Sequence, residues 1–315
     1  MGCEAEMKVL VTGGYGYLGT AVVGELLNEG HQVRVLDNMT YGTTELIKDT
    51  IVGDIMDSRS ISKALEGVDA VVHLAAIVGE GPCNLNKELA VKVNYMATRN
   101  LATMCEERGI KLLFTSTASV YGINRTKDPL HEQSELYPLS VYAATKLAAE
   151  DSIRTCCTDY TIFRLGTLHG ISRRMRFDLA INRFIAMGVS KEVITVFGGS
   201  QHRPFIHLRD VCKFFNKALD YDKLGPFNLG GTNYRIIDIA NTIANNLNAK
   251  VSVLQELKDP RDYEIESRLA VSTFKADINK TVEDSIKEIV PFVQANNYKD
   301  PRFDNEAWLR KIWSS

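Results

Sequence analysis

Short apolar runs alternate along this chain with longer stretches in which apolar residues recur every three or four positions. Strands are predicted for MKVLVTG, HQVRVLD, DAVVHLAA, KLLFTSTASVYG and YTIFRLGTLHG. Helical spacing fills the intervals at about residues 17–29, after Asp57, and around residues 95–108 and 141–155. This order is typical of βαβ units. It predicts a doubly wound, mostly parallel α/β sheet of the Rossmann type with helices on both faces.

The pattern changes after Gly170. A basic loop, SRRMRFDL, precedes a predicted helix and a strand-like EVITVFGG; a helix in RPFIHLRDVCKFFNKALD, a short strand FNLGG and a helix in RIIDIANTIANNL follow. The tail combines a strand, KVSVLQEL, with a loop and two helical patterns. These mixed elements predict a smaller α+β unit beside the main sheet.

Composition narrows the classes of partner. The chain has 315 residues, 45% of them hydrophobic, which is enough for one large core and a smaller second one. Its formal net charge of −2 gives no general attraction to nucleic acid or anionic membranes. The opening residues lack the pattern of a secretory signal, and no apolar run approaches the ~20 residues of a membrane span. We expect a soluble, cytoplasmic protein with neither kind of partner.

The cysteines favour reduced thiols over a metal site or a disulfide framework. Six are present, with no CxxC motif and no paired Cys/His spacing of the zinc type. The adjacent pair Cys156 and Cys157 could form a redox element, but buried or bystander thiols are the favoured interpretation. No metal is therefore predicted.

A glycine-rich turn stands between the first strand and the first helix. VTGGYGYLGTAVVGELL places Gly13, Gly16 and Gly19 where a backbone can approach a pyrophosphate closely. Backbone amides and the positive end of the helix would then stabilise the phosphate charge. A glycine turn of purely structural use is the less favoured alternative.

An acidic residue at the end of the second strand favours NAD as the nucleotide. Asp37 lies 18 residues beyond Gly19, where a carboxylate can accept both ribose hydroxyls and would repel a 2′-phosphate. The following residues, including Asn38, offer no arginine to such a phosphate. Asp54 is a candidate for the adenine edge, and a helix cap or turn is nearly as favoured.

Three side chains suggest a proton relay beside a hydride acceptor. Thr117 ends a predicted strand, and Tyr142 and Lys146 lie one helical turn apart. An ammonium near a phenol stabilises phenolate and so lowers the pKa of the tyrosine, while the threonine hydroxyl can bind the reacting oxygen. A lone Tyr and Lys at this spacing often means only neighbours on one helical face.

The segments TGGYGYLG, HLAA, STASVYG, YAATK and RPFIHLRD resemble the extended short-chain dehydrogenase/reductase family of nucleotide-sugar enzymes. The motifs are most similar to those of UDP-galactose 4-epimerases. The resemblance implies an NAD-binding Rossmann domain at residues 1–166, completed by about 196–232. It also implies a substrate-binding domain at 167–195 and 233–315, a nucleotide-diphosphate sugar as substrate, and a homodimer. The dimer helices would be those around residues 87–107 and 141–155, although their apolar faces could equally pack on the chain's own sheet.

The same resemblance assigns site residues. Thr117, Tyr142 and Lys146 form the catalytic set. The expected cofactor contacts are Gly13, Gly16, Tyr17, Leu18, Gly19, Asp37, Asn38, Asp54, Ile55, Leu74, Ala75, Ala76, Asn94, Tyr142 and Lys146. The expected substrate contacts are Thr117, Thr167, Arg203 and Arg261, with both arginines directed at the diphosphate. Thr167 stands where many relatives carry asparagine, and the basic loop with Arg173, Arg174 and Arg176 is interpreted either as a solvated face or as a phosphate contact.

Two positions favour one reaction of this family. Dehydratases carry Asp and Glu directly after the catalytic Ser or Thr, whereas this chain has Ala118 and Ser119. We therefore expect an NAD-dependent epimerase that acts at C4 through a transient 4-keto sugar. The alternatives are a nucleotide-sugar 4-ketoreductase or another small-molecule dehydrogenase and, less favoured, a dinucleotide-sensing protein without catalysis. His73, His169 and His207 are interpreted as structural.

Overall fold

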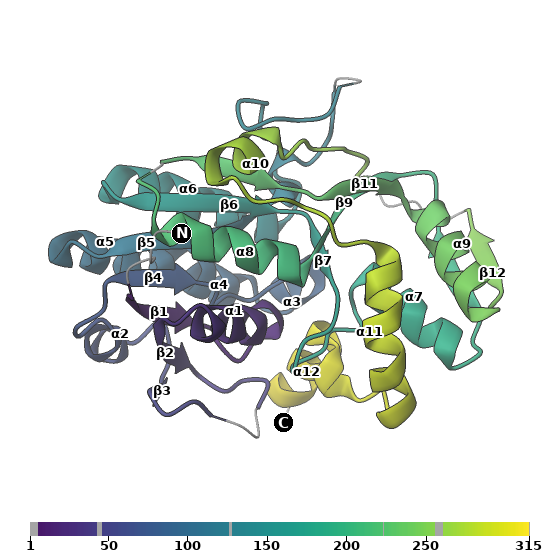
Figure 1. Ribbon diagram of the computed structural model, residues 1–315, viewed down its shortest axis with the longest axis horizontal. Coiled ribbons are helices and arrows are strands. Elements are labelled where there is room, and N and C mark those ends of the chain that lie inside the picture. The colour runs from purple at the N-terminus through teal and green to yellow at the C-terminus, as the bar shows by residue number, and fades with distance from the viewer. Residues whose placement is uncertain (1–5, 43–45, 126–127, 223, 256–260, 315) are drawn as a thin grey trace.

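A seven-stranded sheet forms the centre of the computed structural model, which describes residues 6–42, 46–125, 128–222, 224–255 and 261–314 (Figure 1). The strand order is β10-β6-β5-β4-β1-β2-β3, and every neighbouring pair is parallel. This confirms the doubly wound α/β fold that the alternating pattern predicts. The strands are β1 (Lys8–Thr12), β2 (Gln32–Asp37), β3 (Thr50–Val52), β4 (Ala70–His73), β5 (Lys111–Thr117), β6 (Tyr160–Leu165) and β10 (Pro226–Leu229).

Helices cover both faces of this sheet. On one face α1 and α8 pack through Val22, Leu26 and Phe215, and on the other α2, α5 and α6 pack through a second apolar cluster that includes Leu101 and Ile153. Burial on both faces explains the consecutive apolar residues within strands such as β1 (KVLVT) and β4 (AVVH). The helices are α1 (Tyr17–Asn28), α2 (Ser58–Ala64), α3 (Glu80–Leu85), α4 (Lys87–Val91), the π-helix η1 (Lys92–Ala97), α5 (Thr98–Arg108), the 3-10 turn η2 (Ala118–Tyr121), α6 (Val141–Cys156) and α8 (Leu208–Leu219).

A second, smaller lobe contains two short sheets, a three-stranded one in the order β11-β9-β7 and a pair β12-β8. Helices α7, α9 and α11 pack around its apolar core. The elements are β7 (Thr167–His169), α7 (Ala180–Val189), β8 (Ile194–Phe197), β9 (His202–His207), β11 (Thr232–Arg235), α9 (Ile236–Leu247), β12 (Val251–Leu254), α11 (Val282–Ala295), η3 (Pro301–Phe303) and α12 (Asn305–Trp313). Helix α10 (Arg268–Phe274) instead packs against β10 and α8 of the first lobe.

The tail holds three helices after β12 rather than the two that apolar spacing predicts. The last of them, α12, returns to the first lobe (Figure 1). The indole Nε1 of Trp308 donates to the Thr40 carbonyl at 2.7 Å, and Leu309 packs in an apolar cluster with Ile77 and Cys83. A helix from the end of the chain therefore lies against the loops that follow β2 and β4.

Cys83, Cys105, Cys156, Cys157 and Cys212 are free thiols, and Cys3 lies outside the described residues. Among the described residues no cluster of three His, Cys, Asp or Glu side chains could hold a metal ion. A search of the same residues finds no helix long and apolar enough to cross a membrane.

A buried ion pair ties α6 to the sheet. The guanidinium of Arg164 on β6 donates through Nε and Nη2 to Glu150 on α6, at 3.0 and 2.7 Å, and both side chains are essentially inaccessible to solvent. The hydroxyl of Ser116 on β5 also donates to Glu150, and Arg164 Nη1 donates to the Tyr121 hydroxyl. Such a network must be complete, because an unpaired buried charge is costly.

Replacing Arg164 should therefore destabilise the fold strongly. We expect Arg164→Met to lower the free energy of unfolding by about 3–5 kcal/mol, because it leaves the Glu150 carboxylate buried without its main partner. Arg154→Met is the matched control, since Arg154 pairs with the same carboxylate from a partly exposed position and should cost under about 1 kcal/mol. Urea unfolding measures both, and equal losses would contradict the assignment.

Candidate active site

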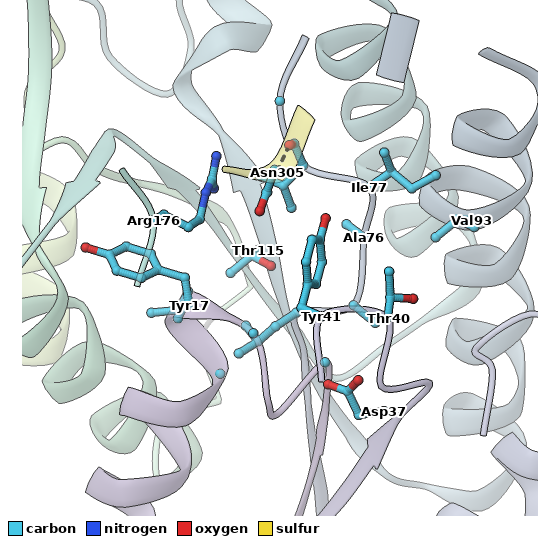
Figure 2. Close-up of a pocket in the computed structure, with 18 of the residues that line it drawn as sticks. Tyr17, Asp37, Thr40, Tyr41, Ala76, Ile77, Val93, Thr115, Arg176 and Asn305 are labelled. Atoms are coloured by element: carbon cyan, nitrogen blue, oxygen red, sulfur yellow. Dashed lines mark hydrogen bonds between the residues drawn. The ribbon is translucent and has the colours of Figure 1, made fainter. Parts of the chain in front are cut away.

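A cavity of about 490 Å³ opens at the carboxyl ends of β1, β2, β4, β5 and β6, between the sheet and the second lobe. Figure 2 shows Tyr17, Tyr41, Arg176 and Asn305 around it, with Asp37 toward one end. The cavity lies in the crevice where parallel α/β folds bind ligands. The residues expected from the sequence that line it are Gly13, Gly16, Tyr17, Leu18, Gly19, Asp37, Asn38, Asp54, Ile55, Leu74, Ala75, Ala76, Thr117, Tyr142, Lys146 and Thr167.

The glycine turn forms one wall because only glycine fits there. Gly13 has φ +69°, and a Cβ on it would stand 2.8 Å from the backbone of Ala75. A Cβ on Gly19 would stand 2.1 Å from the Gly13 carbonyl oxygen. The turn is thus packed tightly against the start of α1, whose N-cap is Gly16. A bare backbone at a helix N-terminus fits a pyrophosphate such as that of NAD.

Two carboxylates lie at the end of the cavity that follows β2 and β3. Asp37 accepts hydrogen bonds from the backbone amides of Tyr15 and Met39, at 3.0 and 2.8 Å. Burial raises the pKa of the Asp37 carboxyl, and these two amides partly oppose the rise. Asp54 accepts from Asn38 Nδ2 at 3.0 Å. These acceptors fit the hydroxyls and base edge of an adenosine moiety.

The expected catalytic side chains gather at the other end of the cavity. Thr117 ends β5, and Tyr142 and Lys146 lie on α6, whose first turn is capped by Ser140 accepting from the Ala143 amide at 3.2 Å. The Lys146 ammonium donates to the Thr115 carbonyl at 2.8 Å. Burial lowers the pKa of Lys146 from 10.5 to about 8. The arrangement provides a phenol, a hydroxyl and an amine within one enclosed site.

The electrostatics of Tyr142 differ from the expectation that an ammonium lowers its pKa. Burial raises the pKa of the phenol, and the charge of Arg176 and a hydrogen bond with Thr117 oppose the rise only in part. The physical reason is that the protein shields the phenol from solvent, while Lys146 directs its ammonium to a backbone carbonyl. Ionisation of Tyr142 therefore needs further positive charge in the site.

Asn94 does not line the cavity, contrary to the expected cofactor contact. It is buried in η1, where its Oδ1 accepts from the Ile77 amide at 2.8 Å and its Nδ2 donates to the Ile77 carbonyl at 3.0 Å. The side chain instead holds the segment after β4, and Ile77 itself faces the cavity. Asn94 thus holds the backbone of Ile77, a residue of the cavity wall, without contacting the cavity itself.

Arg203 and Arg261 also lie away from the cavity wall. Arg203 on β9 donates to the His202 carbonyl at 2.7 Å, and its guanidinium carbon lies 5.3 Å from the ring centroid of Tyr263. Arg261 forms an ion pair with Glu80 at 2.5 Å. Tyr263 does line the cavity, so Arg203 stands one aromatic ring behind the wall.

The three histidines serve packing. His73 is hydrogen-bonded to Thr12 at 2.7 Å and to Thr98 at 2.9 Å, and burial lowers its pKa to about 3. His169 is bonded to a serine of α11, Ser285, at 2.7 Å, and His207 accepts from the Arg209 amide that starts α8.

The polar cavity residues that were not assigned as contacts from the sequence include Tyr41, Arg174, Arg176 and Asn305. Arg174 and Arg176 are each about nine-tenths buried, so a solvated basic face is the wrong interpretation for both, whereas Arg173 is exposed. Arg176 makes a double hydrogen bond to Asp178, at 3.0 and 2.6 Å. The apolar neighbours in RRMRFD are buried too, and they were the one available signal that this loop faces inward.

Fold and glycine turn define a dinucleotide-binding protein with a second lobe over the site. Comparison with known sequences gives the family: the profile described as NAD dependent epimerase/dehydratase family matches residues 9–230. The chain belongs to that family. The residues present fit its cofactor, since the glycine cradle, Asp37 and the buried cavity are all in place.

Curated relatives carry several activities. UDP-glucuronic acid decarboxylase 1 of Arabidopsis thaliana is 28% identical over 256 residues, which are 76% of this chain and 58% of that protein. This chain therefore spans less than two thirds of that relative's length. An uncharacterized UDP-glucose epimerase of Bacillus subtilis, YtcB, is 31% identical over 247 residues, covering 71% of this chain and 77% of that protein.

Solved structures share the fold over nearly the whole chain. UDP-glucose 4-epimerase of Thermotoga maritima with UDP-glucose has a TM-score of 0.83 at 23% identity, covering 92% of this chain and 99% of that one. UDP-glucuronic acid 4-epimerase of Bacillus cereus, in complex with UDP-glucuronic acid and NAD, has a TM-score of 0.79 at 26% identity, with the same coverage.

The buried ammonium of Lys146 predicts a stability that depends on pH. A pKa lowered from 10.5 to about 8 means that the folded chain binds this proton less tightly than the unfolded chain does. Removing the group in Lys146→Met should therefore stabilise the protein by about 1–3 kcal/mol at pH 7. Between the two pKa values only the unfolded chain holds the proton, so the contribution of Lys146 becomes less unfavourable and the advantage of the variant shrinks.

Urea unfolding of both proteins at several values between pH 7 and 10 measures this difference. Lys92→Met, at an exposed position, controls for the loss of one lysine charge. A stability difference between Lys146→Met and the unmodified chain that stayed constant across the range would contradict the burial of a charged Lys146.

Proposed function

We propose that this chain is an NAD-dependent nucleotide-sugar epimerase that acts at C4. One observation carries the proposal: among the described residues that line the cavity, only Asp37 and Asp54 bear carboxylates, and both lie at the β2–β3 end. Elimination of water needs an acid and a base at the sugar, and the positions after Thr117 are Ala118, which is buried, and Ser119. Epimerisation needs only removal and return of a proton and a hydride at one carbon.

The chain's own residues account for the proton. Tyr142 in its phenolate form accepts the proton of the 4-hydroxyl and returns it, while the Thr117 hydroxyl bonds the same oxygen and orients it. NAD, when bound, supplies the hydride acceptor and a positive charge. Because burial raises the pKa of the Tyr142 phenol, the phenolate would need the positive charge of bound NAD in addition to the Lys146 ammonium one helical turn away. Arg176 adds a second positive charge near the phenol.

The relatives support oxidation of a nucleotide sugar as the first step, and they favour two reactions that could follow it. Two proteins similar to this chain are named as epimerases of UDP-glucose or UDP-glucuronic acid, which favours the proposal. The similarity to UDP-glucuronic acid decarboxylases makes decarboxylation the second candidate. A uronic acid oxidised at C4 is a β-keto acid, and such acids lose carbon dioxide readily. The two reactions would thus share their first step.

The reaction can be tested on freshly dialysed protein. We expect near-stoichiometric retained NAD and interconversion of C4 epimers when UDP-glucose, UDP-galactose or UDP-glucuronic acid is supplied, followed by NMR. Tyr142→Phe should lower turnover at least about 100-fold while NAD stays bound. Tyr160→Phe, a half-buried tyrosine on β6 outside the cavity, is the control. Release of carbon dioxide, or net accumulation of free NADH, would overturn epimerisation in favour of a decarboxylase or a dehydrogenase.

We also propose that the two lobes bind different ligands. Residues 1–166, completed by about 196–232, would bind NAD, and residues 167–195 and 233–315 the nucleotide sugar, with Arg203 and Arg261 as proposed diphosphate contacts. In support, β10 and α8 join the main sheet. Half of β8 and all of β9, although inside the 196–232 range, lie in the small sheets. The free thiols agree with a proposed cytoplasmic location.

A homodimer through η1, α5 and α6 is the proposed assembly. The exposed face of this region carries Val91 and Met96, and the exposed fraction of Met96 is 56%. We expect light scattering to give twice the mass of one chain, and Met96→Asp to shift it toward one chain because a charge would enter an apolar interface. Leu27→Asp, on α1 with 45% exposure, is the control. A monomer mass for the unmodified chain would exclude the dimer.

A further inference from the structure

Arg174 is a buried guanidinium with unused hydrogen-bonding capacity on the cavity wall. Its side chain is 8% exposed, its Nη2 donates to the Arg302 carbonyl at 3.1 Å, and its guanidinium carbon lies 4.0 Å from the ring centroid of Tyr41. Its Nε is buried without a hydrogen-bond partner among the described residues. A buried N–H group without a partner is costly unless a ligand completes it.

The Arg174 guanidinium forms no ion pair with a carboxylate among the described residues. Arg176, its neighbour in the loop, has its own carboxylate partner in Asp178. Of the other carboxylates whose charge Arg174 feels, Asp304 is engaged in capping α12, where it accepts from the Ala307 amide at 2.9 Å. Burial, followed by the charge of Arg176, lowers the pKa of Arg174 to about 10. The guanidinium therefore lies on the cavity wall without a carboxylate of these residues paired to it, and an anion in the cavity would supply that partner.

The loop that carries Arg174 lies across the start of α1. The Ser172 hydroxyl donates to the Tyr17 carbonyl at 2.7 Å and is also bonded to the Thr20 hydroxyl at 2.7 Å. Two residues further on, the Arg174 guanidinium reaches Tyr41, which comes from the loop after β2 and points into the cavity (Figure 2). The loop thus contacts the first turn of α1 through Ser172 and the loop after β2 through the Arg174 guanidinium, and both elements lie beside the glycine turn.

We propose that Arg174 binds a diphosphate in this cavity, and that this diphosphate belongs to the dinucleotide cofactor. A guanidinium forms strong, often paired, hydrogen bonds with phosphate oxygens. The α1 N-terminus and the glycine turn beside it favour the same anion from the other side. A nucleotide sugar would bring a diphosphate of the same chemistry, but the contacts of the Arg174 loop with Tyr17 and Thr20 point to the cofactor. The inference concerns binding and does not depend on which sugar reaction the chain performs.

The test compares Arg174→Gln with Arg173→Gln, which removes the same charge from the exposed neighbouring position. The full-length chain, freed of resident nucleotide, is titrated with NAD⁺, ADP, adenosine and UDP in a calorimeter. We expect Arg174→Gln to weaken NAD⁺ and ADP by about tenfold or more, with adenosine and UDP unchanged and no effect from Arg173→Gln. Arg174→Lys, which keeps the charge and spares the fold, should recover part of the ADP affinity.

Three results would overturn the assignment. Loss of UDP affinity with unchanged ADP affinity would place Arg174 on the substrate's diphosphate. An equal loss for ADP and adenosine would show that the substitution disturbs the site as a whole rather than a phosphate contact. Unchanged affinities for all four probes would mean that Arg174 binds no diphosphate.

Discussion

The buried pair of Glu150 and Arg164 fixes the geometry on which the site depends. Glu150 lies on α6 one turn beyond Lys146, and it is held by Arg164 of β6 and by the Ser116 hydroxyl of β5. Ser116 directly precedes Thr117. The same carboxylate therefore fixes the position of α6 relative to the end of β5. It thereby fixes the positions of Tyr142 and Lys146 relative to the hydroxyl of Thr117. Because the pair is buried, a shift of α6 along the sheet would leave one of the two charges buried without its partner. The free-energy cost of that separation holds α6 in its position.

Local patterns predicted the parts of the molecule that local forces decide. The parallel sheet follows from apolar runs at β spacing, and the glycine turn follows from positions such as Gly13 and Gly19 where a Cβ would collide with backbone. Asp37 lines the cavity because it ends a strand beside that turn. These features depend on neighbours along the chain or on the adjacent strand, so residue type and spacing carry the information.

Contacts between distant segments could not be predicted in this way. The position of α12 depends on the hydrogen bond from Trp308 to the Thr40 carbonyl and on the packing of Leu309 with Ile77. No spacing of apolar residues within α12 indicates where its apolar face will pack. Asn94 was expected in the wall because of its motif, yet its amide is used by the backbone of Ile77. Of the tail helices, α10 has only seven residues, too few to show a period.

The electrostatics of the cavity connect catalysis to what the cavity binds. Burial opposes ionisation of Tyr142 and also opposes protonation of Lys146. Without a ligand the phenol therefore stays neutral, while Lys146, with a pKa of about 8, still holds its proton at pH 7. An anionic ligand beside Arg174 would favour the charged guanidinium and so lower the cost of keeping it buried. A dinucleotide whose nicotinamide is positive and whose diphosphate is negative would complement both ends of this site. The proton relay would then become active only with the cofactor in place, which couples the acidity of Tyr142 to cofactor retention rather than to α6 alone.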